Sequence, residues 1–166
     1  MIPVNRPPSN VIECRNGHLV YLTQHMRRDE IEQYLALTGA DVYDPEVAAR
    51  GFMNTPSACK FTVVGRDGLP AVSGGFEEVI PGVWQSWMVG TEIGWEHNWR
   101  AITKATRWLM DGLLAQGARR LQTTATTNRE AAIAWYINGL GMHQEGLWKN
   151  YGRNGEDVAQ FARLGG

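Results

Sequence analysis

The last third of the chain, residues 119–163, constrains the fold more than any other segment. Arg120 to Thr126 is predicted to be a β-strand, and a helix is predicted to open at Asn128. The pair Gly141-Met142 ends that helix, a strand containing Glu145-Gly146 follows, and the Asn154-Gly155 turn leads into a second strand. This order of strand, helix, glycine break and hairpin predicts one half of a mixed sheet with a helix packed on it.

Length and composition narrow the class of protein. The 166 residues suit one domain, and a hydrophobic content of 43% with 20% charged residues is typical of a globular protein. A net charge of −1 creates no long-range electrostatic attraction to nucleic acid or membrane, so nucleic-acid binding is not expected. No apolar run approaches the ~20 residues of a membrane span. The two cysteines lack metal spacing, and no secretory signal is recognisable, so we expect free thiols and a cytoplasmic location.

The first half of the chain is predicted from its prolines, caps and periodicity. Residues 1–16 carry three prolines and are expected to form an extended arm, with a single domain over residues 17–166. A short strand is predicted over His18 to Thr23, from the alternation around Leu19 and Tyr21. A helix is predicted from Met26 to Thr38, and a second short helix opens at Asp44-Pro45, since Asp caps helices and Pro suits the first helical position.

The middle of the chain is predicted to be a meander followed by a long helix. Turns at residues 65–68 and 81–82 separate three strands, which are expected over Ala58 to Val64, Pro70 to Ile80 and Val83 to Val89. The helix is expected over residues 96–116, with Ile102, Ala105, Leu109 and Leu113 on one face and Arg100, Lys104 and Arg107 on the other. The predicted order is β-αα-βββ-α-β-α-ββ. This is an α/β (α+β) architecture with a mixed, mostly antiparallel sheet flanked by helices.

This order resembles the fold of the GCN5-related N-acetyltransferases (GNAT) over residues 18–163. Asn128, the Ala131-Ala132 pair, Trp135-Tyr136 and Gly141-Met142 are similar to the series that ends many such domains, with an Asn-to-Gly spacing about two residues longer. In that family the Asn and Tyr lie beside the thioester of acetyl-CoA and the leaving thiol. The resemblance therefore implies that Asn128 contacts the cofactor and that Tyr136 is the general acid.

A narrower likeness concerns the GNAT-like proteins of short-tailed phages, including a small internal virion protein that accompanies DNA ejection. It is carried by Trp87-Met-Val-Gly-Thr91 followed by a basic helix, and by the hairpin that ends in Phe161. The resemblance implies a virion component in the host cytoplasm and the virion, with other phage virion proteins as partners.

The turn before the long helix departs from the acetyltransferase pattern. Acetyltransferases carry Gln/Arg-x-x-Gly-x-Gly/Ala there, because glycines let backbone N–H groups approach the diphosphate of coenzyme A. Here the turn offers only Gly94, between Glu92 and Glu96, and bulky Trp95 and Trp99 flank it. Arg100 and Lys104 remain as phosphate ligands. If acetyl-CoA binds, its contacts are expected at Met88, Val89, Gly90, Arg100, Lys104 and Asn128.

Candidate catalytic residues are few. A transferase needs a base for the amine and an acid for the thiolate, and Glu77, Glu78 and Glu92 are the candidates for the base, with Tyr136 for the acid. Each also has a structural interpretation, as a solvated strand-end carboxylate or a half-buried aromatic. The four histidines form no metal set. Two hypotheses stay open: a phage GNAT-fold virion protein with a degenerate coenzyme A site, and an active acetyl-CoA-dependent N-acetyltransferase acting on an amine or protein.

Overall fold

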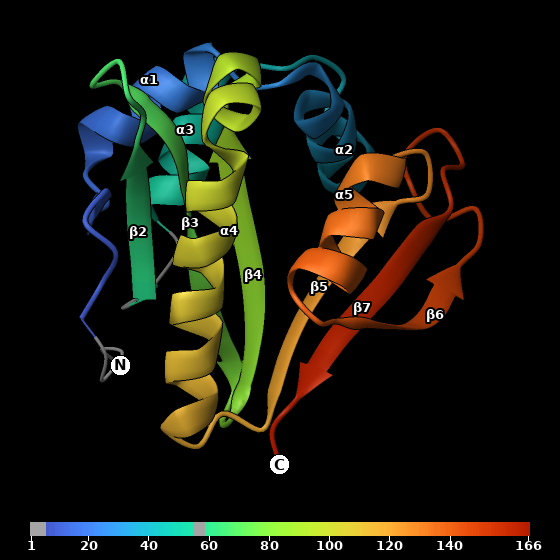
Figure 1. Cartoon of the computed structure of the whole chain (residues 1–166). Coiled ribbons are helices and arrows are strands. Elements are labelled where there is room, and N and C mark those ends of the chain that lie inside the picture. The colour runs from blue at the N-terminus through green and yellow to red at the C-terminus, as the bar shows by residue number, and fades with distance from the viewer. Residues whose placement is uncertain (1–5, 55–58) are drawn as a thin grey trace.

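A computed structural model describes residues 6–54 and 59–166, which form one seven-stranded sheet with helices on both faces (Figure 1). The strand order is β1-β2-β3-β4-β5-β7-β6, and within the described residues every neighbouring pair is antiparallel except β4 and β5. The strands are β1 Val11–Glu13, β2 Cys59–Val64, β3 Pro70–Ile80, β4 Val83–Gly90, β5 Arg120–Thr126, β6 His143–Trp148 and β7 Val158–Leu164. The predicted mixed, mostly antiparallel sheet flanked by helices is confirmed.

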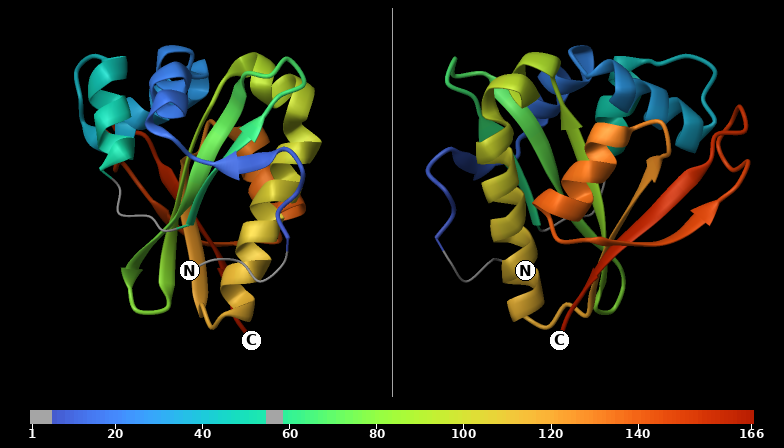
Figure 2. Two further views of the ribbon diagram at one scale, coloured as in Figure 1. Left: turned by 90° about the vertical axis from the view of Figure 1, so that its left-hand side faces the viewer. Right: turned by 45° about the vertical axis from the view of Figure 1, so that its right-hand side comes forward.

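The first strand lies in the segment expected to be an arm. Val11–Glu13 pairs antiparallel with β2, with Val11 opposite Val63 and Glu13 opposite Phe61. Residues 1–5 of that arm, and Ala58 at the expected start of β2, lie outside the described residues. Figure 2 shows β1 at the edge of the sheet, beside β2.

The strand predicted over His18 to Thr23 is wrong, because the segment is helical. It belongs to α1, Asn16–Gln24, whose buried residues are Leu19, Leu22 and Thr23. Their spacing of three and four residues is the one a helix needs to bury one face. The alternation of Leu19 and Tyr21 was too short to distinguish the two periods.

The next two helices agree with the predictions. The helix α2 spans Arg28–Thr38 and ends at Gly39, which adopts a left-handed φ of 73°. The helix α3 spans Pro45–Met53, and the Asp44 carboxylate accepts the backbone N–H of Glu46 at 2.9 Å. The helices α1 and α3 pack together on one face of the sheet, over a small cluster that contains Leu19, Leu22 and Val89.

The long helix α4, Glu92–Ala115, covers the opposite face of the sheet. It begins four residues before the predicted residue 96, because Thr91 caps it: the Gly94 N–H donates to Thr91 Oγ1 at 2.8 Å. The predicted apolar face is confirmed, since Ile102, Ala105, Leu109 and Leu113 are all buried in the main core. Trp84 belongs to this core while Trp87 packs on the α1 side, as their odd spacing in a strand predicts.

The C-terminal half follows the predicted order of strand, helix and hairpin. After β5 the helix α5, Glu130–Ala134, continues without a break into a π-helical turn, η1, over Trp135–Gly139. Leu140 N donates to Trp135 O at 3.0 Å, which is the i to i+5 bond of a π-helix. Helices α5 and η1 lie beside α4 on the same side of the sheet (Figure 2). Within the described ranges, none of the helices is both long and apolar enough to cross a bilayer.

Candidate active site

The parallel strands β4 and β5 separate after a short paired stretch. They pair only where Val83, Trp84 and Gln85 face Arg120, Leu121 and Gln122. Beyond this point β4 pairs only with β3, and β5 only with β7. The V-shaped divergence is visible in Figure 1. A cavity of about 550 Å³ lies at this divergence, and we call it the cleft.

The helix α2 and the residue before it close the cleft at the C-terminal ends of β4 and β5, which we call its upper end. Arg27 N donates to the Gly90 carbonyl at 3.0 Å, so the link between α1 and α2 covers the end of β4. On the opposite strand, Thr126 N donates to Gln33 Oε1 of α2 at 3.1 Å. At the lower end, the Ser86 hydroxyl donates to the Thr123 hydroxyl at 2.7 Å. Between these bonds, no strand among the described residues pairs with the facing edges of β4 and β5.

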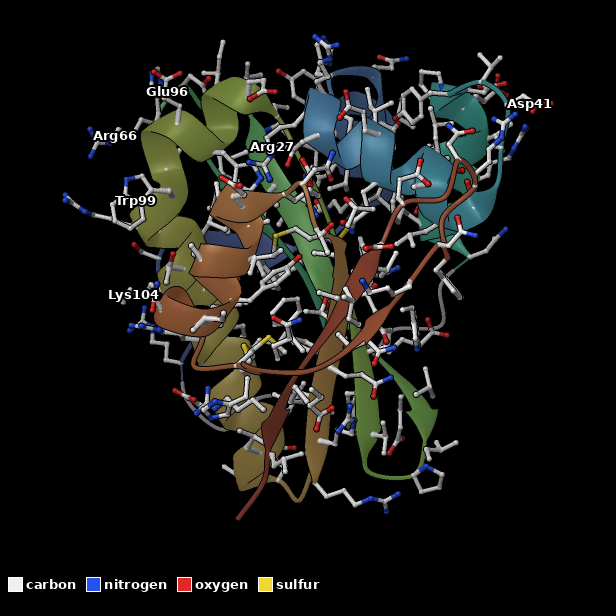
Figure 3. All side chains as sticks on the ribbon, turned by 90° about the vertical axis from the view of Figure 1, so that its right-hand side faces the viewer. Arg27, Asp41, Arg66, Glu96, Trp99 and Lys104 are labelled. Carbon is white, nitrogen blue, oxygen red and sulfur yellow. The ribbon has the colours of Figure 1, made fainter. Side chains whose placement is uncertain are left out.

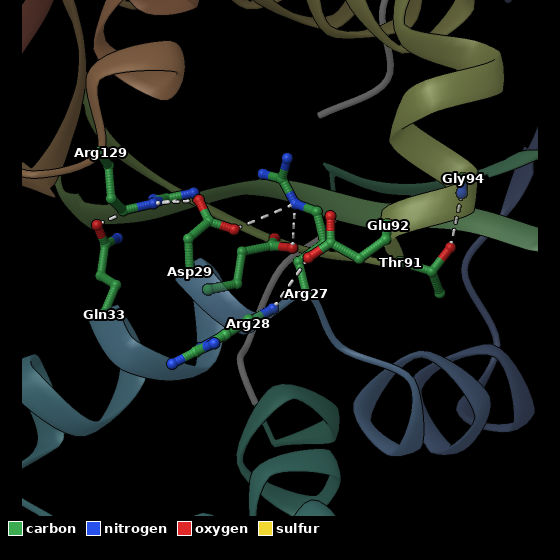
Figure 4. A network of polar contacts seen from close by, with 9 residues as sticks. Arg27, Arg28, Asp29, Gln33, Thr91, Glu92, Gly94 and Arg129 are labelled. Atoms are coloured by element: carbon green, nitrogen blue, oxygen red, sulfur yellow. Dashed lines mark hydrogen bonds and ion pairs between the residues drawn. The ribbon is translucent and has the colours of Figure 1, made fainter.

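A network of charged side chains crosses the cleft from α2 to the start of α5 (Figure 4). Arg129 Nε donates to Asp29 at 2.9 Å, and a second Arg129 nitrogen donates to Gln33 Oε1 at 2.9 Å. Arg27 Nε donates to Glu30 at 2.8 Å and lies 3.6 Å from Asp29. The network therefore links β5 to α2 and places four charged groups at one end of the cleft.

Glu30 is the buried member of this network. Only 8% of its surface is exposed. Burial raises the pKa of the Glu30 carboxyl to about 7, although the neighbouring Arg27 guanidinium opposes that rise. The carboxylate therefore takes up or releases a proton near neutral pH, which is the range in which a general base works.

Aromatic residues of α5 and η1 form the opposite wall. Ala131, Ala132, Trp135 and Tyr136 all line the cleft. The Tyr136 ring packs 5.5 Å from Phe161 and 5.8 Å from Trp135, measured between centroids. Trp95 meets Trp135 edge to face at 5.0 Å, and the Arg27 guanidinium lies 4.5 Å from the centre of the Trp95 ring.

A second group of aromatic rings lies between α2, α3 and β4, and we call it the aromatic wall: Tyr34, Phe52 and Trp87. Phe52 stacks on Trp87 with centroids 5.5 Å apart, and Tyr34 lies 6.5 Å from Phe52. All three residues line the cleft. In the part of the chain that the structure describes, the indole N–H groups of Trp87 and Trp95 are buried donors without an acceptor.

The turn between β4 and α4 is tightly packed. The Gly94 N–H is bonded to the Thr91 hydroxyl, and a Cβ at Gly94 would lie 2.5 Å from the Ala71 carbonyl oxygen. Trp95 lies over Gly90, where a Cβ would come within 2.6 Å of the indole nitrogen. Both glycines thus serve packing within the protein, and neither forms an open backbone cradle for a diphosphate.

A larger groove of about 1000 Å³ lies outside the cleft, between α4, η1 and the segment at Arg6. We call it the outer groove. Its cations are Arg6, Arg100, Lys104 and Arg107, whereas its acid, Asp111, accepts a bond from Arg163 at 2.7 Å. Figure 3 shows Trp99 and Lys104 projecting from the same side of α4. Trp99 and Trp135 line both the groove and the cleft, so the two spaces adjoin.

The residues predicted for the site fall into four places. Tyr136 and Met88 line the cleft, and Arg100 and Lys104 line the outer groove. Val89 is fully buried in the α1-side cluster, and Gly90 lies beneath Trp95. Glu78, Glu92 and Asn128 are exposed and do not line the cleft.

The exposed carboxylates of the prediction make local structural bonds. Glu78 accepts the Gly82 N–H at 2.8 Å in the β3–β4 turn, and Glu92 accepts the Arg28 N–H at 3.2 Å. The charged residues of the cleft that sequence reasoning missed are Arg27, Asp29, Glu30 and Arg129. A signal for Glu30 was present, because Glu30, Tyr34 and Leu37 recur at the spacing of one helical face. Within residues 6–54 and 59–166, His, Cys, Asp and Glu form no group able to hold a metal ion.

Solved structures with the same arrangement identify the fold. An acetyltransferase of the GNAT family from Bacillus anthracis superposes with a TM-score of 0.69, at 14% identity over 93% of each chain. The ribosomal-protein-S18-alanine N-acetyltransferase of Escherichia coli gives 0.67 at 14% identity, over 93% of this chain and 91% of that one. This chain has the GNAT fold.

A third GNAT-fold structure carries a ligand. The phosphinothricin acetyltransferase of Sinorhizobium meliloti, solved in complex with AcCoA, gives a TM-score of 0.66 at 17% identity, over 94% of this chain and 88% of that one. No protein-family model matches the sequence of this GNAT-fold protein. A search of curated proteins gives no significant match.

The residues of the cleft fit the acylated arm of coenzyme A. An extended chain with amide groups suits the free edges of β4 and β5, in the way that a peptide adds to a sheet edge. The buried indole N–H groups of Trp87 and Trp95 are donors for carbonyl oxygens. The two glycines of the β4–α4 turn do not fit a diphosphate held by glycine backbone, so the groups that would meet the phosphates are the side-chain cations of the outer groove.

Proposed function

We propose that the protein transfers an acyl group from acyl-coenzyme A to an amine in the cleft between β4 and β5. The observation that supports this most is the divergence of the two strands after three paired residues, beside Glu30 and Tyr136. Acetyl-CoA supplies the activated acyl group. Met88 and the free edge of β4 hold its arm, and the cleft excludes water from it.

The transfer moves two protons, and the cleft contains one group for each. As the N–C bond forms and the C–S bond breaks, the amine loses a proton and the thiolate gains one. The Glu30 carboxylate takes the proton of the amine, because burial places its pKa at about 7. The Tyr136 hydroxyl gives a proton to the thiolate. Glu30 therefore replaces Glu78 and Glu92 in our assignment of the base.

The anionic end of the coenzyme lies in the outer groove. Arg100 and Lys104 bind its phosphates there, and Trp99, which is 52% exposed, offers a ring on which a base can stack. This assignment explains how a chain with a closed β4–α4 turn still takes the ligand. Because the backbone cradle is missing, we expect the affinity to depend strongly on salt.

Calorimetric titration with acetyl-CoA and free coenzyme A tests this function. We expect binding in the micromolar range, about −8 kcal/mol, followed by thiol release when a panel of amines and basic peptides is added. Absence of heat at high ligand excess, with circular dichroism showing a folded protein, would contradict the proposal.

The closed β4–α4 turn favours one second candidate, a GNAT-fold virion component that binds no coenzyme A. The Gly94 N–H is bonded to Thr91 and Trp95 lies over Gly90, so neither glycine of this turn offers an open backbone site for the diphosphate. The likeness of residues 87–91 to phage virion proteins is the sequence basis of this candidate. It predicts recovery of the protein, in fixed copy number, from purified and nuclease-treated phage particles. Its absence from those particles would exclude it.

A further inference from the structure

The geometry points to a binding subsite for an amine with an aromatic body, formed by the aromatic wall of Tyr34, Phe52 and Trp87 with Glu30 at its polar end. This inference rests on the proposed function, and it names the class of the acceptor: a primary arylalkyl amine. The amine nitrogen meets the Glu30 carboxylate, and the aryl ring packs against Phe52 and Trp87.

The wall and the carboxylate belong to one contiguous set of side chains. Glu30 and Tyr34 are one helical turn apart on α2 and both line the cleft. Tyr34 contacts Phe52, and Phe52 stacks on Trp87 with an interplanar angle of 25°. Leu37, whose surface is 37% exposed, continues the apolar lining along α2. An aromatic ligand gains stacking contacts from such a surface in addition to the burial of its own area.

The charges at this end of the cleft are balanced in number, but Glu30 shares its bonded cation with Asp29. Two cations, Arg27 and Arg129, and two acids, Asp29 and Glu30, face one another there. Arg129 donates a hydrogen bond to Asp29. Arg27 donates to Glu30 and also lies within ion-pair distance of Asp29. The burial of Glu30 outweighs the single bond from Arg27. An ammonium group bound here would give the Glu30 carboxylate a second cationic partner besides Arg27.

The cleft has room for both substrates. Its volume of about 550 Å³ lies within the usual range of small-molecule sites, roughly 300–1,000 Å³. The aromatic wall is contributed by α2, α3 and β4, whereas Tyr136 comes from η1 on the opposite side. The acceptor therefore approaches from the α2 side, and the position of Tyr136 is left for the leaving thiol.

Calorimetry with three small probes tests the subsite directly. The probes are 2-phenylethylamine, 2-phenylethanol, which lacks the amine, and ethanolamine, which lacks the ring. Each is titrated at pH 7.5 with and without saturating coenzyme A. We expect 2-phenylethylamine to bind at least tenfold more tightly than either of the others. If ethanolamine binds as tightly as 2-phenylethylamine, the aromatic wall does not bind the ring. If 2-phenylethanol binds as tightly as 2-phenylethylamine, Glu30 does not bind the amine.

Two variants and one control locate the probe. Glu30→Gln should lower the affinity for 2-phenylethylamine at least tenfold, and Phe52→Leu should lower it severalfold. Circular dichroism should show that both variant proteins are folded. Glu32→Gln is the matched control, because Glu32 is an exposed residue of the same helix that pairs with Arg28 at 3.2 Å. Unchanged binding by folded Glu30→Gln, or loss in Glu32→Gln equal to that in Glu30→Gln, contradicts the subsite.

The same experiment separates this inference from the proposed function. Binding of 2-phenylethylamine without acetyl transfer would support the subsite and contradict the proposed transferase activity. Transfer to other amines, with no binding of 2-phenylethylamine in either condition, would support the activity and overturn the subsite.

Discussion

Arg129 reaches across the cleft to Asp29, and its Nε lies 2.9 Å from the carboxylate. The two residues are 100 positions apart in the chain, so this ion pair holds α2 against the start of α5. The Arg129 side chain is 7% exposed and that of Asp29 is 41% exposed. Solvent therefore reaches the Asp29 carboxylate but is largely excluded from the Arg129 side chain.

Replacing Arg129 should destabilise the protein. In Arg129→Met, Asp29 and Gln33 lose their buried partner, and we expect a loss of about 2 kcal/mol in the free energy of unfolding. Urea denaturation followed by circular dichroism measures it. Arg28→Ala, whose side chain is 90% exposed, should change the free energy of unfolding by less than about 0.5 kcal/mol. An equal effect of both substitutions would contradict the structural role of Arg129.

Glu30 should give the protein a specific pH dependence. Its pKa is raised from 4.5 to about 7 in the folded state, so the folded protein binds more protons than the unfolded chain between these values. Stability therefore falls as the pH rises through this window, by roughly 3 kcal/mol for this one group.

Glu30→Gln removes the titrating group, so the free energy of unfolding should lose this slope between pH 4.5 and 7. Urea denaturation at four pH values in that window measures the slope. Glu32→Gln, on the exposed side of the same helix, should keep the wild-type slope. A slope that survives in Glu30→Gln would show that another group is responsible.

Tyr136→Phe isolates the hydroxyl that we assign to the leaving thiol. The ring contacts with Phe161 and Trp135 remain, so the free energy of unfolding should change by less than about 1 kcal/mol. Turnover with a saturating amine should fall about 100-fold, the lower range for loss of a general acid. Tyr151→Phe, in the exposed β6–β7 connection, should keep wild-type turnover. Small and equal effects of both substitutions would remove the acid assignment.

The outer groove should be recognised by its response to phosphate and salt. We expect Arg100→Ala and Lys104→Ala each to lower the affinity for coenzyme A about fivefold at low salt, since a charge-assisted contact contributes about 1 kcal/mol to binding. Pantetheine, which lacks the nucleotide, should bind both variants like the wild type. Arg50→Ala, which removes an exposed cation of α3, is the matched control. Equal loss for coenzyme A and pantetheine would place the phosphates elsewhere.

The cap of α4 offers a test of the closed turn. Thr91→Ala removes the hydroxyl that accepts the Gly94 N–H, and a loss of about 1 kcal/mol in stability is expected. Thr91→Ser keeps the hydroxyl and should retain most of that stability. Thermal unfolding of the three proteins at one pH makes the comparison. If Thr91→Ser is as unstable as Thr91→Ala, the methyl group rather than the cap is responsible.

The sequence predicted those parts of the fold that have strong local signals. Asp44-Pro45 marked the start of α3, and the turns at residues 65–68 and 81–82 bounded β3. The helix α1 was mistaken for a strand, because six residues with Leu19 and Tyr21 are compatible with either period. The early start of α4 was missed although Thr91 is a favourable cap, because the turn was compared with a glycine-rich pattern instead.

The cleft was harder to predict than the fold, because its residues are brought together by tertiary contacts. The family likeness concerns the strand and helix that carry Met88 and Tyr136, and both side chains line the cleft, while their roles stay predictions. Glu30 and Arg129 were missed, since a charged residue in an amphipathic helix or beside a helix start is usually exposed. Nothing local in the sequence indicates that Asp29 and Arg129 meet.

The π-helical turn at residues 135–139 also affects how this chain is compared with others. Its i to i+5 bond encloses one residue more than the i to i+4 bond of an α-helix, so an additional residue would fit inside the helix without forming a loop. An alignment that keeps an α-helical register through this turn is displaced by one position on its far side, about 100° around the axis. Residue matches beyond Gly139 should therefore be drawn from superposed coordinates. Gaps in such an alignment belong within the helix, before Gly141, rather than in the hairpin that follows.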